Sequence, residues 1–463
     1  MIIDTHAHID MEQFTEDREE VIQRARESGV GYILNIGCDV ESSYRSLELA
    51  ERYDFIYSTA GVHPHDVKDI NDSTYGELET LLAHPRVIAL GETGLDYFKN
   101  YSPQDQQRTH FRKQIELAIK LNKPLIIHCR DANEDMIAIL SKYYPQDDKA
   151  RPGIFHCFSG DQELAQKALA MGFYISFSGS VTFKKSEVLR EVAKIVPANR
   201  LFAETDCPYL SPVPKRGKRN EPANVHHTAA LLAEVRGLRI EDVLRTMEVN
   251  FFELFGIGKE AKTGIVSYQI RNSLYLNLTN RCTDDCTFCT RLTNPVVQGY
   301  NLKLDREPTN EEVWQSIDDP LKYEEIVFCG FGEPTLRLDT IKEVAKKIKD
   351  AGGRVRLNTN GHGNVINKRN ILPELAGLVD EVSVSLNTDS SEAYDDICRP
   401  LPMFRGIIYD KIKDFIDEAK KYIPDVQVTI VTQQKGVDEA QCKEIVEKRF
   451  GAKYRARRYN MVG

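Results

Sequence analysis

The chain has 463 residues, 41% of them apolar, and a formal net charge of −9 at pH 7. This length exceeds that of one ordinary domain and predicts two or three. The acidic balance argues against a protein that coats nucleic acid by charge alone, although it leaves room for a local basic site. No apolar run approaches the roughly 18 residues of a membrane helix, and no signal-peptide pattern precedes the first motif, so we expect no membrane segment.

Apolar strand-like runs alternate with helix-period stretches over residues 1–257. The runs are IIDTH (2–6), YILNIG (32–37), IYSTAGVH (56–63), VIALGETG (87–94), PLIIHCR (124–130), GIFHCF (153–158), FYISFSG (173–179) and LFAETD (201–206). Eight strand–helix units over about 255 residues predict an α/β fold of the (β/α)8 TIM-barrel type.

A second alternating series occupies residues 268–463. Residues 258–267, GKEAKTGIVS, have little apolar content and are interpreted as a linker between the two series. The second series has the runs LYLNLT (274–279), EIVFCGFGE (325–333), RVRLNTNG (354–361), VDEVSVSLN (379–387), VQVTIVTQQ (426–434) and YRARRY (454–459). Six units predict an open, partial (βα)6 barrel.

The N-terminal run leads directly into the motif DTHAH (4–8). Residues two apart in a strand point to the same face, so His6 and His8 should project together. Two imidazoles on one side of a rigid element form half of a metal site.

Other predicted strands end in residues of the same kind. The C-terminal ends of barrel strands converge on one mouth, and the residues expected there are His63, His65, Glu92, His128, His156 and Asp206. A buried, hydrogen-bonded imidazole would explain one histidine, but the whole set favours a metal site. Nitrogen and carboxylate ligands without cysteine suit Zn²⁺, Mn²⁺ or Mg²⁺.

Six ligands exceed the number that one tetrahedral ion takes, so we expect two ions with a bridging carboxylate, most plausibly Glu92. Two such ions activate a water and hold both oxygens of an in-line displacement at phosphorus. Asp206 would be a ligand and a candidate general base.

Several motifs together resemble the TatD family of metal-dependent deoxyribonucleases over residues 1–256. They are DTHAHID, GVHPH, GETGLDY, IIHCRDA, HCFSG and ETDCPYLSPVPKRGKRNEPANV, in that order. The resemblance implies 3′→5′ exonuclease or related phosphodiester hydrolysis on DNA, with Mg²⁺, Mn²⁺ or Zn²⁺. It implies that the metal ligands are His6, His8, Glu92, His128, His156 and Asp206. It also implies that His63 and His65 line the substrate cleft.

A basic stretch, KRGKRNEPAN (215–224), follows the eighth predicted strand, where barrels often bind phosphate. Arg216, Lys218 and Arg219 are therefore candidates for binding a nucleic-acid backbone. A solvated charged loop is the alternative.

A cysteine triplet dominates the second series. Cys282, Cys286 and Cys289 have the spacing C-x3-C-x2-C. Zinc modules usually take four ligands in two pairs, and no second pair follows, so a structural zinc loop is the weaker interpretation. Three thiolates suit a [4Fe–4S] cluster with one open iron. Ten cysteines are too few for a disulfide scaffold, and the cluster chemistry indicates a reducing cytoplasm.

The triplet and the segments after it resemble the radical S-adenosylmethionine (SAM) superfamily over residues 270–463. GFGEP (330–334) is similar to the family's glycine-rich GGE motif, with Phe331 between the glycines as a small departure. The resemblance implies that SAM contacts come from Gly330, Gly332, Glu333, Asn360 and Ser385. It also implies reductive cleavage of SAM to a radical that abstracts hydrogen. An electron donor such as flavodoxin or ferredoxin would be needed.

Together these observations predict a fusion of two enzymes, similar to TatD-linked radical SAM proteins. Two alternatives concern the first domain. It could hydrolyse another bond, such as the ester of a D-aminoacyl-tRNA, because an activated water attacks carbonyls as well as phosphorus. It could instead be only a nucleic-acid binding module for the radical enzyme. The substrate of the radical domain is not predicted.

Overall fold

The computed structural model describes residues 1–71, 73–145, 151–258, 264–292, 295–432, 434 and 436–458. Two compact units divide the chain, Met1–Glu260 and Ala261–Gly463. Residues 259–263 of the expected linker lie outside the described residues. Among the described helices, none is both long enough and apolar enough to cross a membrane.

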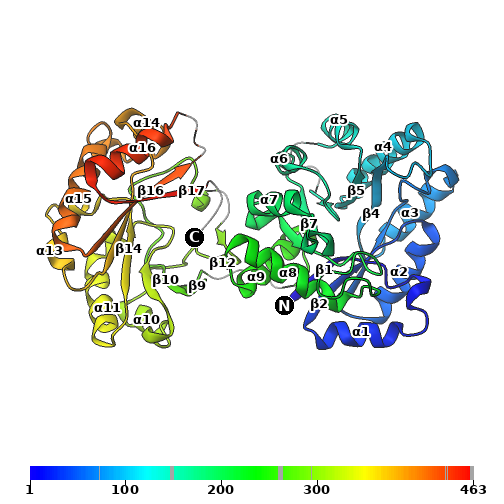
Figure 1. The fold of residues 1–463 in the computed structure, drawn as a ribbon, viewed down its shortest axis with the longest axis horizontal. Coiled ribbons are helices and arrows are strands. Elements are labelled where there is room, and N and C mark those ends of the chain that lie inside the picture. The colour runs from blue at the N-terminus through cyan, green and yellow to red at the C-terminus, as the bar shows by residue number, and fades with distance from the viewer. Residues whose placement is uncertain are drawn as a thin grey trace. The chain divides into compact units, whose positions relative to one another are not determined.

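The first unit is built on eight parallel strands that follow one another in chain order (Figure 1). They are β1 (Ile2–Ala7), β2 (Val30–Asn35), β3 (Ile56–Ala60), β4 (Val87–Asp96), β5 (Leu125–Arg130), β6 (Ile154–Phe155), β7 (Tyr174–Phe177) and β8 (Leu201–Ala203). Backbone hydrogen bonds close the ring just beyond β8, from His8 N to Cys207 O (2.9 Å) and from Asp206 N to His6 O (2.9 Å). The predicted TIM barrel is confirmed.

Helices surround this barrel and supply the outer half of its core. They are α1 (Arg18–Glu27), α2 (Val40–Arg52), α3 (Thr74–Leu82), α4 (Gln104–Lys120), α5 (Asn133–Tyr143), α6 (Gln162–Ala170), α7 (Glu187–Ile195), α8 (Val225–Arg236) and α9 (Ile240–Phe255). A capping box between Asp39 and Ser42 begins α2. At the other end of the unit, the ring of Phe251 on α9 stacks on Tyr32 at 5.3 Å.

Four strands, β3, β6, β7 and β8, are shorter than their apolar runs predict. Strand β6 ends at Phe155 and β8 at Ala203, so His156 and Asp206 lie in the loops that follow. Each of these two loops contains a left-handed residue, with φ of 40° at Cys157 and 55° at Asp206. This conformation breaks the extended chain and turns both loops over the mouth of the barrel.

The second unit contains a seven-stranded sheet in the order β17-β16-β15-β14-β13-β10-β9. Its strands are β9 (Ser267–Ile270), β10 (Ser273–Leu276), β13 (Glu325–Phe328), β14 (Val355–Thr359), β15 (Glu381–Ser385), β16 (Asp425–Thr432) and β17 (Lys453–Arg458). Six of them are parallel and confirm the predicted partial barrel. Strand β9 pairs antiparallel with β10 and was not predicted, because its first residue falls in the expected linker. A separate hairpin joins β11 (Val296–Val297) and β12 (Tyr300–Asn301).

Helices cover one face of this sheet, with α11, α13 and α15 side by side along it in Figure 1. The helices are α10 (Asn310–Gln315), α11 (Leu338–Asp350), α12 (Gly363–Ile366), α13 (Leu372–Leu375), α14 (Ser391–Ile397), α15 (Ile408–Tyr422) and α16 (Glu439–Glu444). Alternate strand residues such as Leu357 and Val384 pack into the core beneath these helices. Their sequence neighbours therefore point to the opposite, inner face of the partial barrel.

The two cores share no residue, which predicts independent unfolding of the two units. Phe251 lies in the first core and Phe415 in the second, and both are fully buried. We expect Phe251→Ala or Phe415→Ala to lower the free energy of unfolding of its own unit by about 3–5 kcal/mol. Calorimetry of the full chain should show one transition moving in each variant. A joint shift of both transitions by either substitution would contradict this expectation.

Candidate functional site

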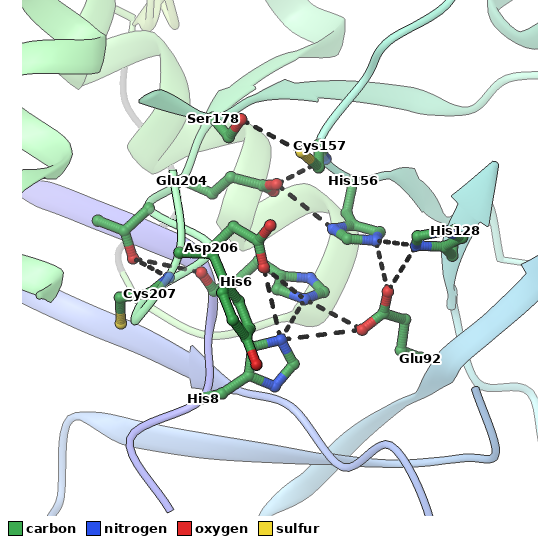
Figure 2. A network of polar contacts seen from close by, with 12 residues as sticks. His6, His8, Glu92, His128, His156, Cys157, Ser178, Glu204, Asp206 and Cys207 are labelled. Carbon is green, nitrogen blue, oxygen red and sulfur yellow. Dashed lines mark hydrogen bonds and ion pairs between the residues drawn. The ribbon is translucent and has the colours of Figure 1, made fainter. Parts of the chain in front are cut away.

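Glu92 on β4 lies at the centre of a cluster of histidines (Figure 2). Its Oε1 atom is 2.7 Å from His156 Nε2, 2.9 Å from His128 Nδ1 and 3.4 Å from His63 Nε2. Its Oε2 atom is 3.4 Å from His6 Nε2. The two carboxylate oxygens thus face two different sets of imidazoles.

Asp206 is the second carboxylate of the cluster. Its Oδ1 atom is 3.5 Å from His8 Nε2 and 3.8 Å from His6 Nε2. His6 and His8 lie side by side, with their Nε2 atoms 3.2 Å apart. The closure of the barrel between β1 and the chain after β8 produces this juxtaposition.

Three overlapping groups of donor atoms lie within 4.8 Å of one another, and they include all six predicted ligands. The groups are His6–His8–Glu92, His6–His156–Asp206 and His63–Glu92–His128. Glu92 and His6 each belong to two groups, and Glu92 presents Oε2 to His6 in one group and Oε1 to His128 in the other, as a carboxylate between two ions would. His63, which is predicted to line the substrate cleft, is a member of the third group, with Glu92 and His128.

The donor set fits divalent cations. Two pairs of imidazole nitrogens face each other at 3.2 Å, His6 Nε2 with His8 Nε2 and His128 Nδ1 with His156 Nε2. Two lone pairs repel at this separation unless a proton or a cation lies between them. The buried Nδ1 of His6 has no partner in the described structure. Nitrogen and carboxylate donors of this kind suit Zn²⁺, Mn²⁺ or Mg²⁺.

Electrostatics divide the histidines of the cluster into two sets. Burial lowers the pKa of His8, His128 and His156, but contacts with neighbouring carboxylates outweigh it and raise all three pKa values. Burial alone would raise the pKa of Glu92, but the neighbouring histidines, His156 and His63 foremost, hold that pKa well below its usual value. Burial lowers the pKa of His63 to about 4 and also lowers the pKa of His6. At neutral pH these two rings are therefore uncharged, which is the form of imidazole that binds metals.

Two further carboxylates orient the imidazoles from outside the cluster. Asp96 Oδ2 is 3.1 Å from His128 Nε2 and 3.0 Å from His65 Nε2. Glu204 Oε1 is 3.5 Å from His156 Nδ1 and accepts a hydrogen bond from Cys157 N (2.6 Å). Such contacts fix which nitrogen of a ligand ring faces the metal.

Asp96 and Glu204 also lie at the ends of predicted strands, but no role was predicted for them. An even separation from a predicted ligand, from Glu92 to Asp96 and from Glu204 to Asp206, is the signal that could have indicated them.

Cys38 is a member of the cluster that sequence reasoning missed. Its Sγ atom lies 3.7 Å from His8 Nδ1 and 3.7 Å from Glu92 Oε2. Burial raises the pKa of this thiol well above its usual value, so it stays protonated. Its place just after β2, equivalent to the strand ends that carry histidine, is the signal that was available.

The basic residues of the loop after β8 differ in their contacts with the rest of the protein. Arg219 pairs with Asp17, Nη2 to Oδ2 at 2.6 Å, and its guanidinium lies 4.5 Å from the centre of the Phe14 ring. Arg219 is thus already engaged within the protein. Arg216 and Lys218 are exposed, with the Arg216 guanidinium over the ring of Phe183.

The cysteine triplet lies on one loop after β10. Cys289 N donates to Cys286 O (3.0 Å). Burial raises the pKa of Cys282 and of Cys289, and the Cys286 thiol adds to both shifts, so the three sulfur atoms lie within electrostatic range. Three thiols on one short loop fit the predicted iron–sulfur cluster.

A fourth thiol, unpredicted, lies beside this loop. A hydrogen bond that the Cys286 thiol donates to Cys398 is the largest cause of a pKa of Cys286 well above the usual value. Backbone hydrogen bonds join the same segments, from Asp285 N to Cys398 O (3.0 Å) and from Thr287 N to Ile397 O (2.9 Å). The loop is therefore held against the end of α14.

The glycine-rich segment after β13 packs closely against the start of the cysteine loop. Gly332 N donates to Thr279 O (2.9 Å), and a Cβ atom at Gly332 would lie 2.2 Å from Arg281 O. A Cβ atom at Gly330 would lie 2.0 Å from Asn277 Oδ1. Only glycine permits this approach at either position.

The remaining predicted SAM contacts lie at the carboxyl ends of neighbouring strands. Glu333 is buried, and its Oε2 accepts a hydrogen bond from Asn360 N (2.8 Å). Asn360 Nδ2 in turn donates to Thr283 Oγ1 (2.9 Å) in the cysteine loop. Ser385 ends β15, with its Oγ 3.3 Å from Thr429 Oγ1.

A parallel eight-stranded barrel with overlapping histidine and carboxylate groups at its mouth defines a metal-dependent hydrolase. The second unit, a partial barrel with a three-cysteine loop, defines a radical SAM enzyme domain.

Comparison with known proteins leads to the same classes. The family of TatD related DNases matches residues 3–256, and the Radical SAM superfamily matches residues 276–448. The uncharacterized metal-dependent hydrolase YabD of Bacillus subtilis is 44% identical over 257 residues, 56% of this chain and 100% of that protein. The 3′-5′ ssDNA/RNA exonuclease TatD of Shigella flexneri is 37% identical over 261 residues, 55% of this chain and 99% of that protein.

A solved structure, the TatD homolog YJJV of Escherichia coli K12, is 30% identical with a TM-score of 0.53, and the match covers 56% of this chain and 98% of that one. The chain belongs to the TatD related DNase family and continues into a radical SAM domain. Both predicted resemblances are confirmed.

The contact of Asp96 with His128 predicts a role in holding metal. We expect Asp96→Asn to weaken binding of one ion by about 10- to 100-fold, because the ring loses the carboxylate that fixes its orientation. Titration of metal-free protein with Mn²⁺ measures this directly. Asp69→Asn, at an exposed position, is the control. Equal Mn²⁺ affinity in both variants would show that Asp96 has no such role.

Proposed function

We propose that the first unit is a 3′→5′ exonuclease that hydrolyses phosphodiester bonds in single-stranded DNA with two divalent ions. The observation that carries the proposal is the position of Glu92 in two donor groups at once. The name of the Shigella relative, a 3′-5′ ssDNA/RNA exonuclease, supports the choice of substrate.

The six predicted ligands have defined tasks in this proposal, and His63 and His65 would line the substrate cleft. His6, His8 and Asp206 would hold one ion, His128 and His156 the other, and Glu92 both. Such ions, when bound, lower the pKa of a water and stabilise negative charge at phosphorus.

Asp206 would receive the proton of the attacking water. Burial raises its pKa, but the hydrogen bond with His8 and the charges of the neighbouring histidines bring that pKa below its usual value. The carboxylate is therefore ionised and able to accept a proton at neutral pH. Oδ1 faces His6 and His8, which leaves Oδ2 as the proposed acceptor.

Exposed aromatic rings near the cluster support a single-stranded substrate. Phe98 and Tyr101, on the loop after β4, are 54% and 55% exposed. The Tyr101 ring centre lies 4.7 Å from that of His65, and the guanidinium of Arg130 lies 3.8 Å from the centre of the Phe98 ring. Unpaired bases stack on such rings without regard to sequence. Arg216 and Lys218, both exposed, are the proposed contacts to the phosphate backbone.

We propose that the second unit binds a [4Fe–4S] cluster through Cys282, Cys286 and Cys289 and cleaves SAM. The cluster would supply the electron for that cleavage. Gly330, Gly332, Glu333, Asn360 and Ser385 are the proposed SAM contacts. Free thiols at all three cluster positions support a reducing cytoplasmic setting, with flavodoxin or ferredoxin as the class of electron donor. We assign residues 1–257 to the hydrolase, 258–267 to a linker and 268–463 to the radical SAM domain.

For the hydrolase, we expect release of nucleotides from 3′-labelled single-stranded DNA with Mg²⁺ or Mn²⁺. Glu92→Gln should reduce the rate on the order of 100-fold or more, because it removes the shared carboxylate. Glu163→Gln, at an exposed position of α6, is the matched control. Deacylation of D-aminoacyl-tRNA without DNA cleavage would instead establish the alternative ester hydrolase. DNA binding without either reaction would establish a binding module.

For the radical SAM domain, we expect anaerobic reconstitution with iron and sulfide to give a reducible cluster whose EPR signal changes on addition of SAM. Cys286→Ala should prevent cluster assembly, measured as bound iron, because it removes one of three ligands. Cys442→Ala, at a buried position in the helix-facing core, should retain the iron. A reduced cluster whose EPR spectrum ignores SAM would contradict the proposal.

A further inference from the structure

The last strand of the second unit, β17, carries basic residues on the inner face of the partial barrel. In its pairing with β16, Tyr454 and Ala456 lie opposite Val428 and Ile430, which belong to the helix-facing core. Lys453, Arg455 and Arg457 therefore alternate onto the other face. This run, YRARRY, has no task in the function proposed above.

The basic residues at the amino ends of the strands are neutralised by carboxylates. Lys453 Nζ is 2.7 Å from Asp425 Oδ1, and Arg356 Nη2 is 3.0 Å from Glu325 Oε1. Towards the carboxyl ends of the strands, such ion pairs are missing from the described structure for the two arginines on this face of β17. Within the described part of the chain, neither Arg455 nor Arg457 has a carboxylate partner.

Arg457 is the more deeply placed of these two arginines. Its Nη2 donates to Ser385 Oγ at 3.4 Å, and its Nε is buried without a hydrogen-bond partner among the described residues. Burial lowers its pKa, but a guanidinium remains charged throughout the physiological range. A buried cationic donor without a partner is unfavourable, and an anion from a ligand would satisfy it.

Arg457 lies close enough to the predicted cluster site for its charge to act on thiols there. Its charge interacts with the thiols of Cys329, on the loop after β13, and of Cys286, in the cysteine loop. Arg457 thus faces the mouth where the cluster is expected. Among the proposed SAM contacts, Glu333 and Asn360 follow β13 and β14, and Ser385, which contacts Arg457, ends β15. Strand β17 lies three strands from β14, or about 14 Å along the sheet, which leaves room at β17 for a second molecule beside SAM.

We propose that Arg455 and Arg457 bind an oxyanion group of the substrate of the radical SAM domain, either a phosphate or a carboxylate. The proposal rests on the radical SAM function given above. A guanidinium donates two parallel hydrogen bonds to either group. Binding at Arg457 would fix one end of the substrate at β17 and direct the rest towards the cysteine loop.

The test uses the full chain with a reconstituted cluster and Arg457→Gln, measured by calorimetric titration with inorganic phosphate, malonate and SAM. We expect this variant to weaken binding of phosphate or malonate about tenfold or more, since a charge-assisted hydrogen bond is lost. The anion that is affected more identifies the group. Lys453→Gln removes a charge from the same face of the same strand but from an existing ion pair, and it should change anion affinity less than twofold.

SAM affinity separates the possible outcomes. Unchanged SAM affinity in Arg457→Gln, with weakened anion binding, supports the proposal. Equal weakening by Lys453→Gln, no weakening by Arg457→Gln, or an equal loss of SAM affinity would overturn it. If Arg457→Gln fails to fold, Arg457→Lys takes its place in the test. The lysine variant keeps the charge without the planar guanidinium, so we expect an intermediate loss of anion affinity. The EPR response to SAM, recorded on the same samples, reports separately on the radical SAM function.

Discussion

The first barrel is organised around a buried carboxylate. Glu92 is 3% exposed, and an ionised group in that position is strongly unfavourable unless positive charge surrounds it. The imidazoles around it come from β1, β5 and the loops after β3 and β6, so the whole ring must close before the charge is compensated. His6 and His63 are neutral near pH 7, whereas the pKa values of His8, His128 and His156 are raised, so only part of this set of imidazoles can balance the charge of Glu92.

Local patterns in the sequence were sufficient for the barrel and for the six predicted ligands of its cluster. The apolar runs located all eight strands, and the spacing of His6 and His8 placed them on one face. The apolar runs could not predict the residues at which β6 and β8 end. The loops that follow contain left-handed residues, Cys157 and Asp206, whose conformation is stabilised by contacts with distant segments such as Glu204 and β1.

Contacts between distant loops were the part of both sites that the sequence did not reveal. Cys38 reaches His8, and Cys398 reaches Cys286, across long stretches of chain. The cysteine triplet was predictable because its spacing is local, whereas the partner of Cys286 depends on the path of the chain after β15. Strand β9 was missed for a related reason, since four residues of mixed polarity show an edge strand only once β10 is beside them.

The backbone hydrogen bonds between the cysteine loop and residues 397–398 bear on how a cluster would be acquired. Many small metal-binding modules are unfolded until the metal arrives, so that binding and folding are one event. In this chain, backbone hydrogen bonds made by Asp285 and Thr287 attach the cysteine loop to the end of α14, and neither bond involves a cysteine side chain of the triplet. Contacts of this kind restrict the loop by folding alone, so they reduce the conformational entropy that cluster binding would otherwise cost.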